Sequence, residues 1–140
     1  MKVFNVTMSQ VGTALRVKTT ASRGGFVQDI HHELVDLNEI SKTVLQIGLD
    51  YGDVNWACPS SWNPPPPAVD SISYIDVKGS SISGMAASFT GLTDSLITGV
   101  SLDNIALHMT ALGEGHYNCS YVTGTYKNVS PKPCAELVPV

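Results

Sequence analysis

Four segments of this chain repeat one pattern, in which apolar residues stand at the first, fourth and ninth positions. The segments are Val3-Val6-Val11, Val27-Ile30-Val35, Val69-Ile72-Val77 and Ile97-Val100-Ile105. The sixth position is large in every case, being Met8, His32, Tyr74 and Leu102. Each segment is β-branched and rich in Asn, Ser, Thr and Asp, as a strand bounded by tight turns should be. The recurrence predicts a solenoid of stacked units.

The spacing of the repeats gives the size of one unit. The fourth-position residues are Val6, Ile30, Ile72 and Val100, so the middle interval is much longer than the other two. That interval contains residues 53–68, a Trp/Pro-rich stretch whose four consecutive prolines, 64–67, cannot belong to a central strand or a helix interior. Leaving this stretch out brings the middle interval into line with its neighbours. We therefore expect units of about 25 residues with one long excursion.

The kind of solenoid follows from the residues between the repeats. Strong helical periodicity is missing and leucine is sparse, which disfavours helical and leucine-rich repeats. Further strand candidates occur at Ala14–Thr19, Thr43–Leu49 and Met85–Phe89, and two or three strands per coil describe an all-β parallel β-helix. We predict that one interior ladder contains Val6, Ile30, Ile72 and Val100. An end coil needs a cap, and the absence of helix-start signals near Met1 predicts a solenoid incomplete at its N-terminal end.

Charge narrows the class of partner. The net charge is −4, which argues against nucleic acid or an anionic membrane as the main partner, and no stretch is long and apolar enough to span a membrane. Four of the eight basic residues nevertheless precede the first acidic residue, Asp29. These four basic residues are either ordinary surface charge or a binding surface for an anionic ligand.

Residues 15–18 alternate apolar and basic side chains. On a strand, Leu15 and Val17 would point into the core while Arg16 and Lys18 project outward together, about 7 Å apart. Two neighbouring cations repel each other, and a carboxylated sugar would give them a shared partner. The alternative is a solvated strand face with no ligand.

The cysteines and sequons indicate an extracellular protein. Cys119 and Cys134 would close a loop of about 15 residues, worth roughly 3 kcal/mol if bridged. Cys58 is then unpaired or has its partner outside this chain, and no cysteine spacing resembles a zinc site. Glycosylation sequons at Asn5 and Asn118, without a signal-peptide core at the N-terminus, suggest that an N-terminal part is missing.

Taken in order, these motifs resemble the polygalacturonase family, glycoside hydrolase family 28. The family's Gly-x-Arg-Ile-Lys-Thr strand, Gly-Gly turn and Val-x-x-Ile coil match residues 12–30, with Ala14 where the family commonly has Gly. Tyr51 falls where the family has a Tyr after a strand, and residues 117–134 resemble the cysteine-bearing end of plant cell-wall members. The resemblance is colinear over almost the whole chain.

The resemblance implies a secreted or cell-wall, right-handed parallel β-helix that hydrolyses galacturonan with inversion, needs no cofactor or metal and is monomeric when complete. Residues 1–140 would be its C-terminal coils, with the excursion at 53–68 and a cysteine-bearing tail at 117–140. Substrate-holding roles carry over to Arg16, Lys18 and Tyr51.

The resemblance also implies what this chain lacks. The family's catalytic Asn-Thr-Asp and Asp-Asp motifs and its Gly-His-Gly histidine do not occur here, so no catalytic residue is assigned and activity in isolation is not expected. The leading hypothesis is a piece of a pectin-degrading hydrolase. The alternatives are a β-helix that binds acidic polysaccharide without cleaving it and an inert solenoid.

Other candidate site residues have simpler interpretations. Asp50 and Asp53 lie at a loop mouth, where a carboxylate pair is usually solvated or caps a turn. Trp56 and Trp62 could stack on sugar rings, although packing of the excursion onto the solenoid is the favoured interpretation.

The adjacent residues His31 and His32 resemble a pair of metal ligands. Neighbouring residues on a strand, however, point to opposite faces of the sheet. We expect His32 to point inward and His31 outward, and Tyr74 to belong to the core.

Overall fold

The computed structural model describes residues 1–52, 64–110 and 116–140, and its regular elements are strands. They are β1 (Lys2–Lys18), β2 (Phe26–Gly48), β3 (Ala68–Ile82), β4 (Met85–Thr90), β5 (Ile97–Met109), β6 (Tyr117–Ser120), β7 (Val122–Ser130) and β8 (Leu137–Pro139). Each pairing between these strands is parallel. The described residues contain no helix, and hence none long and apolar enough to cross a membrane.

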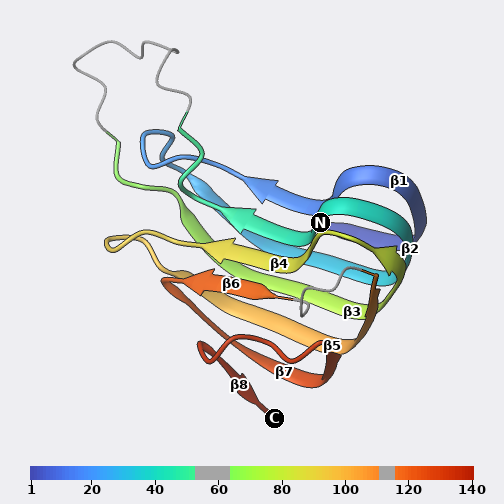
Figure 1. Ribbon diagram of the computed structural model, residues 1–140. Helices are drawn as coiled ribbons and strands as arrows, with labels where there is room; N and C mark the ends of the chain where they lie inside the picture. Colours follow the sequence, from blue (N-terminus) through green and yellow to red (C-terminus); the bar gives the residue numbers. More distant parts are fainter. Residues whose placement is uncertain (53–63, 111–115) are drawn as a thin grey trace.

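The strands stack as successive coils along one axis, from β1 at one end to β7 and β8 at the other (Figure 1). One row of pairings runs β1-β2-β3-β5-β7-β8, and a second runs from the end of β1 through the end of β2 to β4 and β6. Each coil thus has a long bent segment followed by a short one, and in β1 and β2 the two continue as a single strand. The predicted all-β parallel β-helix is confirmed.

The long segments bend at a regular interval of five positions. In β2 the φ angle is positive at Asp29, Leu34 and Glu39, with values of 54°, 56° and 55°. β3 repeats the interval at Ser71, Asp76 and Ser81. The side chains of β2 that point inward are consequently spaced by two positions between bends and three across a bend; they are Ile30, His32, Val35, Leu37 and Ile40. The interval between bends sets which side chains reach the core.

The predicted interior ladder is right for three of its four members. Ile30 pairs with Ile72, and the register between β3 and β5 aligns Val100 with them. The prediction for Val6 is wrong, because Val6 pairs with Val35 and not with Ile30. The true register between β1 and β2 is thus displaced by one bend interval from the register that the sequence spacing indicated. The pattern of inward-pointing side chains recurs with each bend. Shifting β1 along β2 by one bend interval therefore still keeps its apolar residues pointing into the interior.

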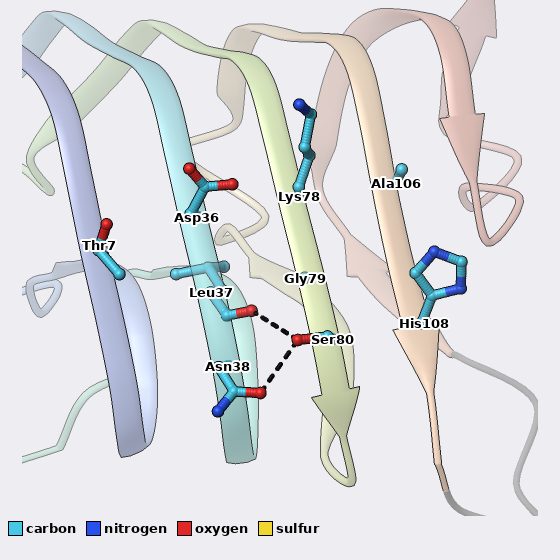
Figure 2. Close-up of a pocket in the computed structure, with 9 residues that line it drawn as sticks. All are labelled: Thr7, Asp36, Leu37, Asn38, Lys78, Gly79, Ser80, Ala106 and His108. Carbon is cyan, nitrogen blue, oxygen red and sulfur yellow. Dashed lines mark hydrogen bonds between the residues drawn. The ribbon is translucent and has the colours of Figure 1, made fainter.

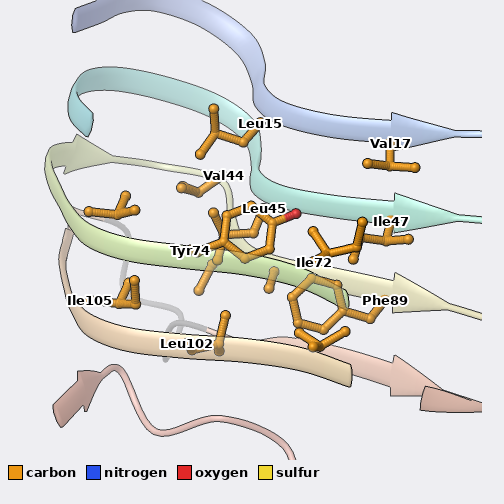
Figure 3. Close-up of a cluster of buried hydrophobic side chains, with 14 of the residues drawn as sticks. Leu15, Val17, Val44, Leu45, Ile47, Ile72, Tyr74, Phe89, Leu102 and Ile105 are labelled. Atoms are coloured by element: carbon orange, nitrogen blue, oxygen red, sulfur yellow. The ribbon is translucent and has the colours of Figure 1, made fainter. Parts of the chain in front are cut away.

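The core lies inside the coils and is built from aliphatic side chains stacked on their equivalents (Figure 3). Leu45, Ile47, Ile72 and Phe89 are 0% exposed. Burying each such side chain contributes roughly 1.5–3 kcal/mol. Successive coils therefore stabilise one another through contacts between like residues.

An aromatic stack crosses this core. The rings of His32 and Tyr74 are nearly parallel with centroids 4.8 Å apart, and the Tyr74 and Phe89 centroids are 6.5 Å apart. The Tyr74 hydroxyl and His32 Nδ1 have no hydrogen-bond partner within the described residues. The predicted orientations are confirmed, since His32 and Tyr74 are buried while His31 is exposed and hydrogen bonded to the Ser73 hydroxyl.

Bend residues of neighbouring coils also stack on the outside. The Asn104 side-chain amide donates to the Asp76 carboxylate, and Asn128 Nδ2 donates to Asn104 Oδ1 at 2.8 Å. These bonds tie β3, β5 and β7 together at one bend. The same position in β2 is Leu34, which cannot extend the ladder.

The tail is fastened to the solenoid by a disulfide. Cys119 on β6 is bonded to Cys134, with Cα atoms 6.2 Å apart. Asn5 and Asn118 are exposed, and glycosylation at both stays a prediction. Cys58 lies outside the described residues.

Candidate anion-binding site

The basic strand has the alternation that its sequence predicted. Leu15 and Val17 are 3% and 8% exposed, whereas the neighbouring Arg16 and Lys18 are exposed. Parallel pairing to the end of β2 holds the strand straight here, with Lys18 opposite Gly48. A Cβ atom at Gly48 would lie only 3.1 Å from the Asp50 carboxylate, so this glycine leaves room for Asp50 beside Lys18.

Tyr51 comes to the same face because the turn after β2 folds back on the turn after β1. The backbone N–H of Tyr51 donates to the Thr19 carbonyl at 3.2 Å, and Thr20 and Asp50 form an antiparallel bridge. The Tyr51 ring then lies under both cations, with Lys18 Nζ 3.4 Å and Arg16 Cζ 5.5 Å from its centroid. The structure thus brings together Arg16, Lys18 and Tyr51, the three residues predicted to hold a ligand.

The ring contact explains how two like charges can share one strand face. An exposed cation over an aromatic ring gains about 0.5–1 kcal/mol, which offsets part of the repulsion between the Arg16 and Lys18 side chains. Tyr51 remains 40% exposed, so the ring is also accessible to a ligand. Sequence reasoning placed Tyr51 at the site without finding this contact, because it depends on the path of two turns.

Two hollows have Tyr51 in their lining. A hollow of about 240 Å³ is lined by Lys18, Thr19, Thr20, Arg23 and Tyr51. A much smaller one of about 20 Å³ is lined by Arg16, Val17, Lys18, Gln46, Gly48, Asp50 and Tyr51. Among the described residues, Lys18 and Tyr51 line both hollows. The larger hollow offers two cations and two threonine hydroxyls beside Tyr51, and the smaller one includes the Asp50 carboxylate.

Arg23 is a positively charged lining residue that the site predicted from the sequence did not include. Its backbone N–H donates to the Thr20 carbonyl at 3.1 Å, which closes the turn after β1. Gly24 and Gly25 follow with φ of 65° and 76°, a backbone conformation that most side chains disfavour. The signal available in the sequence was the acid-free run of basic residues before Asp29, to which Arg23 belongs.

The local charge is unbalanced. In the part of the chain that the structure describes, the ion pair joins Lys2 Nζ to Glu33 Oε2 at 2.6 Å, and neither Arg16, Lys18 nor Arg23 has such a partner. Two cations over the Tyr51 ring, with Arg23 lining the larger hollow beside Lys18, favour an anion there. Among the described lining residues, Asp50 is the one carboxylate, whereas glycosidic hydrolysis uses an acid and a base. The described geometry is therefore suited to holding an anion.

The other sequence candidates do not join this site. His32 is buried, and burial lowers the pKa of its imidazole, against an opposing effect of the Ser73 backbone. Burial likewise raises the pKa of the Tyr74 hydroxyl. Asp53, Trp56 and Trp62 fall outside the described residues, as does the excursion up to residue 63.

A separate hollow of about 450 Å³ lies across the outward side of β1, β2, β3 and β5 (Figure 2). Asp36 and Lys78 sit opposite each other on neighbouring strands there, and His108 projects from β5. The Ser80 hydroxyl donates to Asn38 Oδ1 at 3.0 Å. The hollow is larger than those at Tyr51, but its described lining sets the Asp36 carboxylate against Lys78 and His108 and does not gather charge of one sign.

Comparisons with known proteins bear on this site. The family model described as Glycosyl hydrolases family 28 matches residues 1–134. A curated protein from Vitis vinifera, named "Probable polygalacturonase", is 28% identical over 128 residues, which cover 89% of this chain and 25% of that protein. The chain thus spans about a quarter of the length of this relative. No solved structure matches this chain significantly.

Proposed function

Since this chain belongs to the glycosyl hydrolases of family 28, we propose that it is part of a polygalacturonase and that its basic strand holds galacturonate units of pectin. The observation that carries the proposal is the placement of Lys18 Nζ and Arg16 Cζ over one accessible tyrosine ring. A polymer with one carboxylate per sugar matches a face that carries several cations and few acids.

Each side chain has a distinct role in this proposal. Arg16 offers a planar guanidinium for a carboxylate, and Lys18 offers a compact charge. Tyr51 presents an aromatic face that keeps both cations extended and can lie against a sugar ring. Together they position the polymer, which contributes to catalysis by fixing the scissile bond relative to the acids.

We propose that the catalytic carboxylates belong to coils outside residues 1–140. Inverting hydrolysis places a general acid and a general base roughly 6.5–9.5 Å apart so that water can enter between them. The holding cations supply neither proton donor nor base. On this proposal residues 1–140 are the C-terminal coils of a secreted cell-wall enzyme that is monomeric when complete, with a side excursion at 53–68 and a disulfide-bonded tail.

Two assays on residues 1–140 test the proposal. The chain should bind polygalacturonate and release no new reducing ends. Replacing Arg16 and Lys18 together by Ala should weaken binding at least tenfold, the size of one hydrogen bond to a charged group. A matched control replaces Lys78 and Lys127 by Ala, which removes the same charge elsewhere on the surface and should leave binding nearly unchanged.

Unchanged binding in the Arg16/Lys18 double variant would refute the holding role. Turnover that disappears in Asp50→Ala would instead place a catalytic acid in this chain. Binding without turnover, even when the coils preceding Met1 are present, would favour a β-helix that binds acidic polysaccharide without cleaving it.

A further inference from the structure

We infer that the hollow of about 450 Å³ on the outward side of β2 and β3, which we call the outer hollow, is a binding site for a neutral sugar. The inference goes beyond the proposed function and does not depend on it, because the outer hollow shares no described lining residue with the hollows at Tyr51. It rests on the size of the outer hollow, on two opposite charges in it, and on its mixture of hydrogen-bond donors and acceptors.

The outer hollow and the basic strand occupy different parts of the same coils. Asp36, in the lining of the outer hollow, lies on β2 between the bends at Leu34 and Glu39. Arg16 instead pairs with Gln46, which follows the second of these bends. A ligand in the outer hollow therefore contacts a different part of the coil surface from a ligand on the basic strand.

The outer hollow has the size of a small-molecule site. Ala106 pairs with Lys78 on the neighbouring strand and carries only a methyl group, while the longer side chains of Asp36, Lys78 and His108 are exposed around it (Figure 2). The volume of about 450 Å³ falls within the roughly 300–1,000 Å³ that is typical of ligand pockets. The outer hollow therefore has room for a small organic ligand.

Two opposite charges face the outer hollow without pairing with each other. Asp36 and Lys78 are directly opposite on neighbouring strands, which lie about 4.8 Å apart. In the part of the chain that the structure describes they form no ion pair, whereas Lys2 and Glu33 do. An anion close to Lys78 would meet the Asp36 carboxylate, and a cation close to Asp36 would meet Lys78. A ligand without net charge is therefore favoured.

The polar groups beside this pair are held in place by hydrogen bonds. The Ser80 hydroxyl donates to Asn38 Oδ1 at 3.0 Å, and Asn38 Nδ2 donates to Ser9 Oγ at 3.4 Å. The Ser80 oxygen can still accept a hydrogen bond, as can both oxygens of the Asp36 carboxylate, whereas the Lys78 ammonium only donates. The outer hollow thus offers several acceptors next to a donor.

A sugar matches these groups better than a small zwitterion does. A sugar hydroxyl both donates and accepts, so two neighbouring hydroxyls can donate to Asp36 and accept from Lys78. The Ala106 methyl group and the methylene stem of Lys78 offer apolar surface to the C–H groups of the ring. A zwitterion such as a free amino acid would lose the hydration of two full charges, which costs more than the desolvation of hydroxyls. The site is therefore assigned to a neutral sugar.

The experiment titrates residues 1–140 with two neutral oligosaccharides, galactotetraose and cellotetraose, and follows backbone amide shifts by NMR. At least one of the two should shift the amides of Asp36, Lys78 and Ala106 and leave that of Lys18 in place. Asp36→Ala and Lys78→Ala should each weaken this binding about tenfold, the size of one hydrogen bond to a charged group. Lys127→Ala is the matched control, because it removes an exposed cation from β7, outside the described lining.

A variant that fills the outer hollow tests its shape apart from its charges. Ala106→Ile keeps every polar group and should weaken binding as much as Lys78→Ala. Ala106 is exposed on a strand, where a β-branched side chain is tolerated, so the urea midpoint of this variant should stay unchanged. The double variants of the polygalacturonate assay complete the set. Replacing Lys78 and Lys127 by Ala should lose the neutral sugar and keep polygalacturonate, and replacing Arg16 and Lys18 should do the reverse.

Three results would overturn the inference. Neither oligosaccharide shifts the three amides, or the shifts persist in both Lys78→Ala and Ala106→Ile. Alternatively, free glycine, added as a zwitterionic probe, displaces the sugar from the outer hollow. Unchanged polygalacturonate binding in the Arg16/Lys18 double variant would instead refute the proposed function and leave this inference standing.

Discussion

Tyr74 and Tyr51 place the same side chain in opposite surroundings. Tyr74 is 0% exposed, stacked between His32 and Phe89, with a hydroxyl that meets no partner among the described residues. Tyr51 is 40% exposed and its ring is in contact with two cations. Tyr74 is positioned by a strand with regularly spaced bends, whereas Tyr51 is positioned by a turn that follows no such spacing. Stability is therefore expected to depend on the first ring and ligand binding on the second.

The largest expected effect is the loss of the buried ring. Tyr74→Ala should lower the free energy of unfolding by about 3–5 kcal/mol, because it removes a large core side chain and leaves a cavity. Urea denaturation followed by circular dichroism measures the loss. Tyr74→Phe is the matched control: it keeps the stack and deletes only the hydroxyl that lacks a partner, so it should not destabilise the protein. Equal losses in both variants would mean that the hydroxyl, and not the stack, is what matters.

A smaller and different effect is expected at Tyr51. Tyr51→Ala should weaken binding of polygalacturonate about twofold to fivefold, in line with about 0.5–1 kcal/mol for an exposed cation on an aromatic ring. Its free energy of unfolding should change by less than about 1 kcal/mol. Isothermal titration and urea denaturation of the same preparation separate the two quantities. Tyr51→Phe preserves the ring and should bind like the parent; if it binds as weakly as Tyr51→Ala, the hydroxyl is the contact.

The buried stack should also make stability depend on pH. Burial lowers the pKa of His32 in the folded state below the value of 6.5 expected for an unfolded chain. The unfolded state then binds more protons, so stability is full above pH 6.5 and falls as the pH drops towards the folded pKa. The groups facing His32 are the Tyr74 ring, the Ser73 backbone and the neighbouring His31.

Denaturation midpoints at a series of pH values below neutrality measure this dependence. His32→Phe keeps an aromatic ring in the stack and should flatten the part of the slope that lies below pH 6.5. His31→Phe changes the exposed neighbour and should leave most of the slope in place. A slope that survives in His32→Phe and disappears in His31→Phe would show that the exposed histidine, and not the buried one, titrates.

The inside of this molecule was predictable to a greater extent than its binding face. Stacked coils bury equivalent residues against one another, so Ile30, Ile72 and Val100 could be aligned from spacing alone. The same regularity misled the alignment of Val6, because Ile30 and Val35 stand one bend interval apart and fit the apolar pattern equally well.

On the outside, alternation was enough to predict that Arg16 and Lys18 face solvent together. The contribution of Arg23 and the contact of the cations with the Tyr51 ring follow from turn geometry, including positive φ at Gly24 and Gly25. No periodicity encodes that geometry.

The regular interval between bends has a consequence for how such a chain can change in length. After each bend, the same positions of the interval point inward. A coil that gains or loses one whole interval between bends therefore keeps its apolar side chains in the interior. Insertion or deletion of a single residue would instead turn the following side chains out of the core. A change of one whole interval moves the exit point of the next loop by one bend around the coil. Loops on the outer face can therefore be relocated by whole bends while the interior stays the same.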